Sequence, residues 1–248
     1  LRVVLLVGFL GLSGGLLAQR RGPDSTFLFG SNEKTEWAFA RLRYGGPPGY
    51  RMYSRWATDS PKADRQFVQG VRRLTQLDAR PIEQVVDPDT DELYNWPWLY
   101  AVEVGSWGFT SSEAARMREY LRKGGFLMVD DFHGEAEWQN FLRGMRAIFP
   151  ERAIVDLDNQ DEIFHVLYDV SERLQVPNVG YINTHRTYER VDGVQAHWRG
   201  IRDDQGRLIV AICHNMDLGD AWEWADHPQY PERFTSLAYR IGINYIIY

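Results

Sequence analysis

The sequence has almost no cysteine, and several common nucleotide and metal motifs are missing from it. Its 248 residues include one cysteine, Cys213, so no disulfide can form within the chain. It contains no Gly-x-Gly-x-x-Gly pattern and no phosphate-binding loop, which argues against nucleotide binding through such loops. It also lacks a His-Glu-x-x-His motif, paired cysteines and closely spaced histidines, so no zinc site is indicated. Because Cys213 ends an apolar run, we interpret it as a small buried residue and not as a nucleophile.

The chain also has no excess of positive charge. Its formal net charge is −6, its isoelectric point is about 5.6, and its basic residues are scattered without forming a stripe. This composition argues against a nucleic-acid partner. Aromatic residues are plentiful, with nine tryptophans and thirteen tyrosines available to fill a core.

The one long apolar run lies at residues 1–18. It is shorter than the roughly 20 residues of a membrane-spanning helix and ends in a small residue, Ala18, so it predicts a secretory signal peptide. The expected location is therefore periplasmic or secreted. The alternative is an uncleaved N-terminal membrane anchor, which would be the only contact with a membrane. We expect residues 19–35 to be an irregular lead-in and residues 36–248 to form a single α/β domain.

The rest of the chain alternates between strand and helix patterns. Side chains in the segment 36–44 alternate between two faces, and Thr110 opens a capping box that begins a helix stopped by Gly124 and Gly125. Strands are predicted at 36–44, 98–104, 126–129, 153–157 and 208–213. Helices are predicted after Pro61 with Phe67, Val71 and Leu74 buried, after Thr110, at 138–148, and along 234–245. A strand, a capped helix and a strand in that order predict a parallel crossover, and hence an α/β fold with a mainly parallel sheet.

Asp130, Asp131 and His133 directly follow the apolar strand 126–129 and are the candidate catalytic residues. Polar groups at the carboxyl end of a strand lie where α/β sheets bind ligands. Side chains alternate along a strand, so Asp131 and His133 could share one side, while Asp130 would support a loop or pair with Arg41 or Arg43. Neighbouring carboxylates and an imidazole shift one another's pKa values, which allows a base and an acid. Alternatively, one carboxylate caps the following helix.

A second acidic segment follows the strand 208–213. Acids recur at every third residue from Asp217 to Asp226, and on an α-helix that spacing spreads them over half the circumference. All four therefore cannot converge, but Asp217 and Asp220 with His214 form a plausible subset. The alternative is a solvated acidic loop with Trp222 in the core.

The expected ligand is polar, because aromatic rings next to carboxylates suit sugar rings and hydroxyl groups. Core packing is the competing explanation for any single tryptophan. The candidate ligand-binding residues are Arg41, Arg43, Glu103, Trp107, Asp217, Asp220, Trp222 and Glu223.

Metal binding has only weak support in the sequence. Asp87, Asp89 and Asp91 imitate the opening of a calcium loop, but Glu92 stands where that loop needs glycine and Trp98 where it needs a bidentate acid. No cofactor is evident and the metal is unknown. A divalent cation held by Asp131, Asp217 and Asp220 is an open possibility.

The segments 101–105, 124–134 and 215–226 resemble an uncharacterised bacterial family, catalogued as domain of unknown function 4159. The resemblance runs from about Trp37 to Tyr248. It implies a class I glutamine amidotransferase-like fold, which is a flavodoxin-like three-layer sandwich, and an exported protein. Those amidotransferases need a cysteine at a strand-to-helix elbow. Here Asp130 and Asp131 occupy the equivalent strand end, so glutaminase activity is rejected.

Three functions follow from these observations, and whether the protein is an enzyme stays open. The leading hypothesis is an exported domain that binds a small polar or carbohydrate-like ligand, or an envelope protein, at the strand carboxyl ends. The second is a hydrolase of glycans or esters that uses Asp131 as base or nucleophile, assisted by His133 and an acid from 217–223. The third is a structural envelope component.

Overall fold

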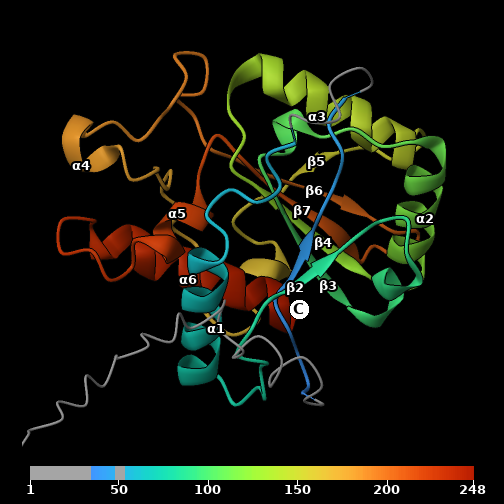
Figure 1. Cartoon of the computed structure of the whole chain (residues 1–248). Coiled ribbons are helices and arrows are strands. Elements are labelled where there is room, and N and C mark those ends of the chain that lie inside the picture. The colour runs from blue at the N-terminus through green and yellow to red at the C-terminus, as the bar shows by residue number, and fades with distance from the viewer. Residues whose placement is uncertain (1–34, 48–53) are drawn as a thin grey trace, which may run out of the picture. The chain divides into compact units, whose positions relative to one another are not determined.

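A seven-stranded mixed sheet, ordered β2-β1-β3-β4-β7-β6-β5, forms the centre of the protein (Figure 1). The computed structural model describes residues 35–47 and 54–248, which belong to one compact unit. The predictions for residues 1–34 lie outside the described residues. The strands are β1 (Ala40–Leu42), β2 (Gln84–Val86), β3 (Trp98–Val102), β4 (Phe126–Asp130), β5 (Val155–Asp156), β6 (His197–Arg202) and β7 (Leu208–His214).

The first five strands of that order are parallel, and the last two are antiparallel to their neighbours. The central strand β4 pairs with β3 on one side and β7 on the other, so that Leu127 lies opposite both Leu99 and Val210. All five residues of β4 are buried, which explains its continuous apolar sequence, because a central parallel strand is covered on both faces.

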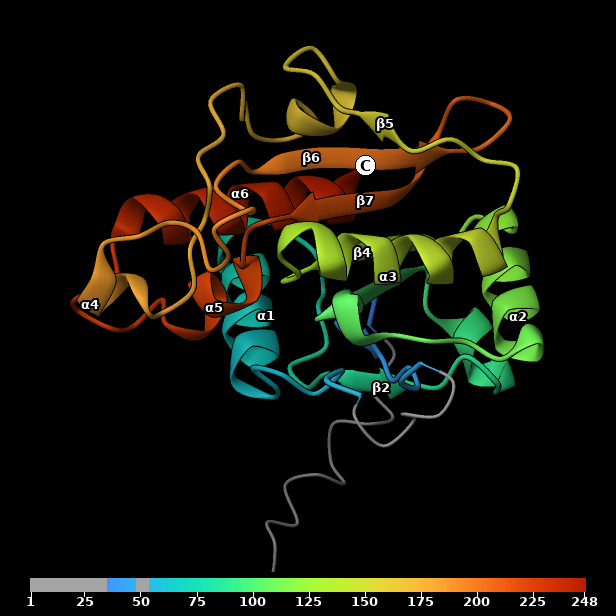
Figure 2. The same ribbon diagram turned by 90° about the horizontal axis from the view of Figure 1, so that it is seen from above.

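Helices lie on both faces of the sheet (Figures 1 and 2). One apolar cluster joins the sheet to α1, α5 and α6, and a second joins it to α2 and α3. The helices are α1 (Lys62–Leu74), α2 (Ser111–Arg122), α3 (Gly134–Ile148), α4 (Tyr181–Thr184), α5 (Leu218–Glu223) and α6 (Glu232–Ile247), with short 3₁₀ turns at Asp91–Asn95, Val104–Ser106 and Glu162–Phe164. No helix among the described residues has the length and apolar character needed to cross a membrane.

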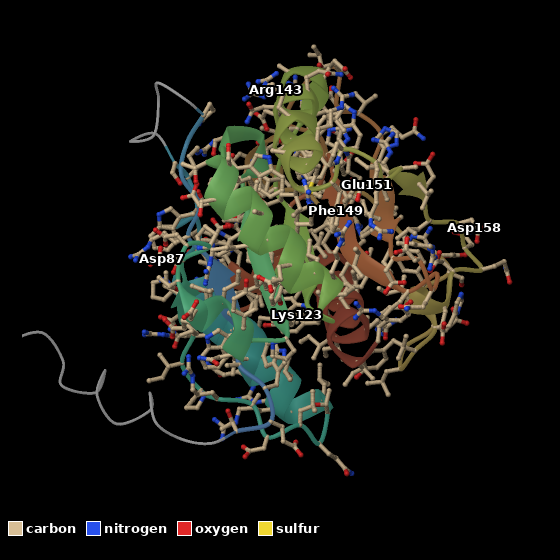
Figure 3. All side chains as sticks on the ribbon, turned by 90° about the vertical axis from the view of Figure 1, so that its right-hand side faces the viewer. Asp87, Lys123, Arg143, Phe149, Glu151 and Asp158 are labelled. Atoms are coloured by element: carbon tan, nitrogen blue, oxygen red, sulfur yellow. The ribbon has the colours of Figure 1, made fainter. Side chains whose placement is uncertain are left out.

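On the face of the sheet covered by α2 and α3, charged side chains lie on the outside (Figure 3), and the second apolar cluster lies between these helices and the sheet. Lys123, Arg143 and Glu151 are exposed, whereas Phe149 is buried beneath them. The capping box at the start of α2 is present as predicted: the Thr110 side chain accepts from the Glu113 N–H, and the Glu113 side chain accepts from the Thr110 N–H.

The predicted α/β class and mainly parallel sheet are confirmed, with several differences in detail. The segment 36–44 does alternate, with Phe39 and Ala40 in opposite core clusters, but only residues 40–42 form a strand. The predicted strand at 153–157 is reduced to a two-residue exposed edge. Leu74 was expected to be buried but is 52% exposed, because it is the last residue of α1. Strand β6 was missed, since its arginines interrupt the apolar pattern.

Candidate functional site

Acidic side chains from four separate loops meet at the carboxyl ends of the parallel strands. We call this group the carboxyl-end acid cluster, and its members are Asp59, Glu103, Asp130, Asp131, Asp217 and Asp220. Carboxylate oxygens of Asp59, Asp131 and Asp217 all lie within 4.8 Å of one another, and the same holds for Asp59, Asp220 and Glu223. The loops after β4 and after β7 therefore meet at one edge of the sheet. Asp59, which precedes α1, was not among the predicted site residues.

Asp130 positions α5. Its Oδ2 atom accepts hydrogen bonds from the N–H groups of Leu218 and Gly219 at 2.8 and 3.0 Å and from the Tyr100 hydroxyl at 3.1 Å. Complete burial raises the pKa of Asp130 to about 7, although the two backbone N–H groups act in the opposite direction. Asp130 thus supports a neighbouring loop, as expected, but the suggested pairing with Arg41 or Arg43 is not present.

Gly219 allows this close approach. A Cβ atom there would lie 2.8 Å from both the Asp59 Oδ2 atom and the Tyr100 hydroxyl oxygen. Any larger residue would separate the start of α5 from the other acids of the cluster.

Asp131 and His133 contact each other, as their spacing predicted. Asp131 has a left-handed backbone conformation, with φ of 53°, and forms the turn between β4 and α3. Its Oδ1 atom lies 3.0 Å from Nε2 of His133. The Oε1 atom of Glu189 lies 3.2 Å from the same nitrogen. Burial, followed by the nearby charge of Glu189, raises the pKa of Asp131 well above its ordinary value.

Glu189 belongs to a segment that lies across the start of α3. Arg190 pairs with Glu137 at 2.9 Å, and Asp192 accepts from the Glu135 N–H at 2.9 Å. Glu137 also accepts from the N–H of His133 at 2.6 Å. No pattern in the sequence indicates Glu189, because it lies far from His133 along the chain in a region without regular spacing.

The remaining members of the cluster are buried beside like charges. Burial raises the pKa of Asp59 to about 9, and the charge of Asp131 adds to this effect. Burial and Asp131 also raise the pKa of Glu103 to about 8, despite its ion pair with Arg55. The pKa of Asp217 is raised well above its ordinary value by burial and then by Asp131. The folded protein therefore holds protons here that isolated carboxyl groups would release at neutral pH.

Asp217 and Asp220 have structural contacts as well. Asp217 caps α5, since its Oδ1 atom accepts from the Asp220 N–H at 2.7 Å. Asp220 accepts from the Val179 N–H at 2.6 Å and from the Trp224 indole at 3.2 Å. His214 does not join them. It stacks on Phe132 and its Nε2 atom lies 3.3 Å from the carbonyl oxygen of Gly134, while burial lowers its pKa to about 3.

The two predicted arginines lie in different surroundings. Arg41 is completely buried and paired with Asp64, and it donates to the carbonyl oxygens of Trp56 and Thr58 at 3.0 and 2.9 Å. It therefore fixes the segment that carries Asp59 and has no exposed surface for a ligand. Arg43 pairs with Asp87 at an exposed position and does not reach the acid cluster.

Trp107 and Trp222 are core residues, which corrects the expectation that they contact a ligand. Trp107 is 1% exposed and stacks on Phe141 with ring centroids 5.1 Å apart. Trp222 is 0% exposed and stacks on Phe67 at 4.2 Å. Core packing, the competing explanation, accounts for both.

Within residues 35–47 and 54–248, three sets of side chains have ligand atoms close enough together to hold a metal ion. They are Asp59 with Asp131 and Asp217; Asp59 with Asp220 and Glu223; and Asp131 with His133 and Glu189. Oxygen-rich sets of this kind suit hard divalent cations such as Mg²⁺ or Ca²⁺. The acidic loop at 87–91 is not one of these sets, because Asp87 pairs with Arg43 and Asp91 with Arg116.

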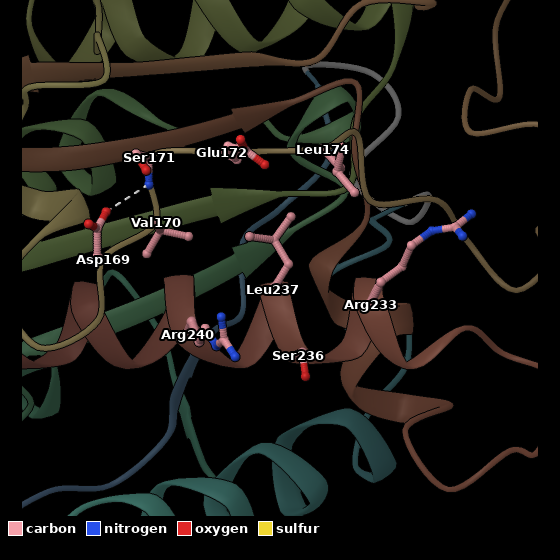
Figure 4. Close-up of a pocket in the computed structure, with 9 residues that line it drawn as sticks. All are labelled: Asp169, Val170, Ser171, Glu172, Leu174, Arg233, Ser236, Leu237 and Arg240. Atoms are coloured by element: carbon pink, nitrogen blue, oxygen red, sulfur yellow. Dashed lines mark hydrogen bonds between the residues drawn. The ribbon is translucent and has the colours of Figure 1, made fainter.

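A surface groove of about 560 Å³ lies away from this cluster (Figure 4). Figure 4 shows Arg233, Leu237 and Arg240 of α6 beside the segment 169–174. None of its lining residues belongs to the acid cluster, so we do not assign the candidate site to it.

The fold and the cluster together define an α/β protein with an acidic site at the carboxyl ends of its parallel strands. Residues 38–248 match the model of the family described as Domain of unknown function (DUF4159), and the chain belongs to that family. No curated protein matches the chain.

Proposed function

We propose that the domain binds a small polar ligand at the carboxyl-end acid cluster, and that this ligand is carbohydrate-like or positively charged. The observation that carries the proposal is the convergence of Asp59, Asp131 and Asp217 within 4.8 Å from three different loops. Carboxyl groups this close cannot all be ionised without a compensating charge or hydrogen-bond donor. Hydroxyl groups, ammonium groups and divalent cations supply these, whereas anions are repelled.

The proposal includes an envelope protein as a partner, because such a protein could present the same hydrogen-bond donors through lysine or hydroxyl side chains. The apolar residues 1–18 support export to the periplasm or beyond by a signal peptide, or retention by an anchor.

We further infer a flavodoxin-like sandwich of the class I glutamine amidotransferase type. The order β2-β1-β3-β4-β7 is the 2-1-3-4-5 order of doubly wound sheets, with helices on both faces. In that arrangement ligands bind where the strand order reverses, between β1 and β3. Glu103 follows β3 directly, which agrees with a ligand at this point. Amidotransferase chemistry is not part of the proposal, because Cys213 is buried within β7.

Replacing Asp217 by asparagine tests the proposed site. Asparagine caps helices as well as aspartate does, so α5 should be preserved while the carboxyl group is replaced by an amide. We expect calorimetric titration with neutral sugars, primary amines, MgCl₂ and CaCl₂ to identify a ligand that Asp217→Asn binds about tenfold more weakly, a loss of about 1.4 kcal/mol.

The matched control is Asp89→Asn, at an exposed position outside the cluster, which should bind as the unmodified protein does. If no probe binds, or if Asp217→Asn and Asp89→Asn bind equally well, the proposed site is wrong. Binding by a neutral sugar, an amine or a metal alone would distinguish the ligand classes.

A hydrolase is the second candidate, and the contact between Asp131 and His133 at a strained strand-to-helix turn favours it. Asparagine tolerates the left-handed backbone of residue 131, so Asp131→Asn should fold. We expect this variant to hydrolyse aryl glycosides or aryl esters roughly 10²–10⁴-fold more slowly than the unmodified protein. Full activity in Asp131→Asn, or no turnover by the unmodified protein, would remove this candidate.

A further inference from the structure

His133 is a buried imidazole whose two ring nitrogens have different surroundings. Its side chain is 5% exposed. Oxygens of Asp131 and Glu189 lie 3.0 and 3.2 Å from Nε2. Both oxygens are hydrogen-bonded to this nitrogen only if it carries the proton, because an unprotonated nitrogen could accept from one oxygen at most. The geometry therefore favours a proton on Nε2, so Asp131, His133 and Glu189 form a hydrogen-bonded set and not a metal site.

The other ring nitrogen, Nδ1, is buried and has no hydrogen-bond partner in the described part of the chain. A proton there would leave a buried N–H donor without an acceptor, which is unfavourable. An unprotonated Nδ1 instead offers a lone pair to a group that the chain does not supply. This arrangement matches that of a general base whose second nitrogen is held by a carboxylate.

We propose that His133 accepts a proton through Nδ1 from a hydroxyl group of the ligand, or from a water molecule beside it. This inference rests on the proposed function, because it assigns a hydroxyl-bearing compound to the same site. The O–H bond breaks, an N–H bond forms at Nδ1, and the electron pair stays on the oxygen. Asp131 and Glu189 are then positioning residues, which fix the ring and stabilise the imidazolium through Nε2–H.

This assignment gives Asp131 a different role from the base or nucleophile that the sequence suggested. It also explains why a carboxylate from a distant segment is brought to the same nitrogen. The Glu189 side chain is 30% exposed, whereas those of His133 and Asp131 are 5% and 7% exposed.

The tautomer of His133 can be measured directly by long-range ¹H–¹⁵N NMR on protein labelled at histidine, with His133→Gln used for assignment. We expect the Nε2–H form to exceed the Nδ1–H form by about tenfold or more. Asp131→Asn and Glu189→Gln should each reduce this ratio, whereas Asp89→Asn should leave it unchanged. A purely structural role for Asp131 or Glu189 would leave the ratio unaltered.

The second measurement is titration of the same labelled protein with glycerol and with D-glucose. A change in the Nδ1 resonance with either probe supports the inference. It is overturned if Nδ1 is protonated, if Nε2 is unprotonated, or if neither probe changes the Nδ1 resonance. Binding of Mg²⁺ or an amine without a change in the Nδ1 resonance would support the proposed function and contradict the role of His133. The proposed function and the role of His133 can therefore fail separately.

Discussion

Replacement of Arg41 by methionine is expected to lower the free energy of unfolding by about 3–5 kcal/mol. Arg41 and Asp64 are both completely buried, so the variant would leave a carboxylate in the core without its cation. It would also remove the donors to the carbonyl oxygens of Trp56 and Thr58. Urea denaturation of the unmodified protein and the variant at neutral pH measures the difference.

Arg43→Met is the matched control, because it breaks an ion pair of the same type at an exposed position. We expect it to cost less than about 1 kcal/mol. The double variant Arg41→Met with Asp64→Leu should recover part of the loss, since it removes the unpaired charge as well. Equal losses for Arg41→Met and Arg43→Met would contradict the structural role assigned to Arg41.

The free energy of unfolding is expected to fall as the pH rises from about 5 to about 9, by more than about 3 kcal/mol. Carboxyl groups of an unfolded chain have pKa values near 4. In the folded protein the pKa is raised to about 7 for Asp130, about 8 for Glu103 and about 9 for Asp59. The folded state therefore binds more protons than the unfolded state between these limits. The stabilisation is complete at low pH and is lost as the pH passes through the folded-state values.

Asp59→Asn should make this pH dependence shallower, because asparagine does not titrate. The variant is expected to be more stable than the unmodified protein by about 1–2 kcal/mol near pH 9. Thermal and urea unfolding at several pH values test both statements, with Asp89→Asn as a control at an exposed acid. Stability that rises with pH, or an unchanged slope in Asp59→Asn, would contradict the raised pKa values.

The sequence was sufficient to predict features that depend on neighbouring residues. The alternation at 36–44 assigned Phe39 and Ala40 to opposite faces correctly. The capping box at Thr110 and the apolar strand before Asp130 were also predicted, because both depend on local spacing and burial.

Contacts between distant segments could not be predicted in the same way. Nothing in the local pattern connects Arg41 to Asp64, and an acid before a helix, such as Asp59, resembles an ordinary cap. Trp107 and Trp222 stood next to acids in the sequence, yet their rings fill the two core clusters on opposite faces of the sheet. A shared site for Asp131 and Asp217 requires that the loops after β4 and β7 meet, and they do, since parallel strands end at the same edge.

The segment from Glu189 to Asp192 is fastened to its surroundings by charged and polar contacts, and its apolar residue Val191 is 89% exposed. Contacts of this kind weaken as ionic strength rises, whereas the apolar core beneath them does not. This segment should consequently loosen more readily in concentrated salt, while the body of the protein stays folded.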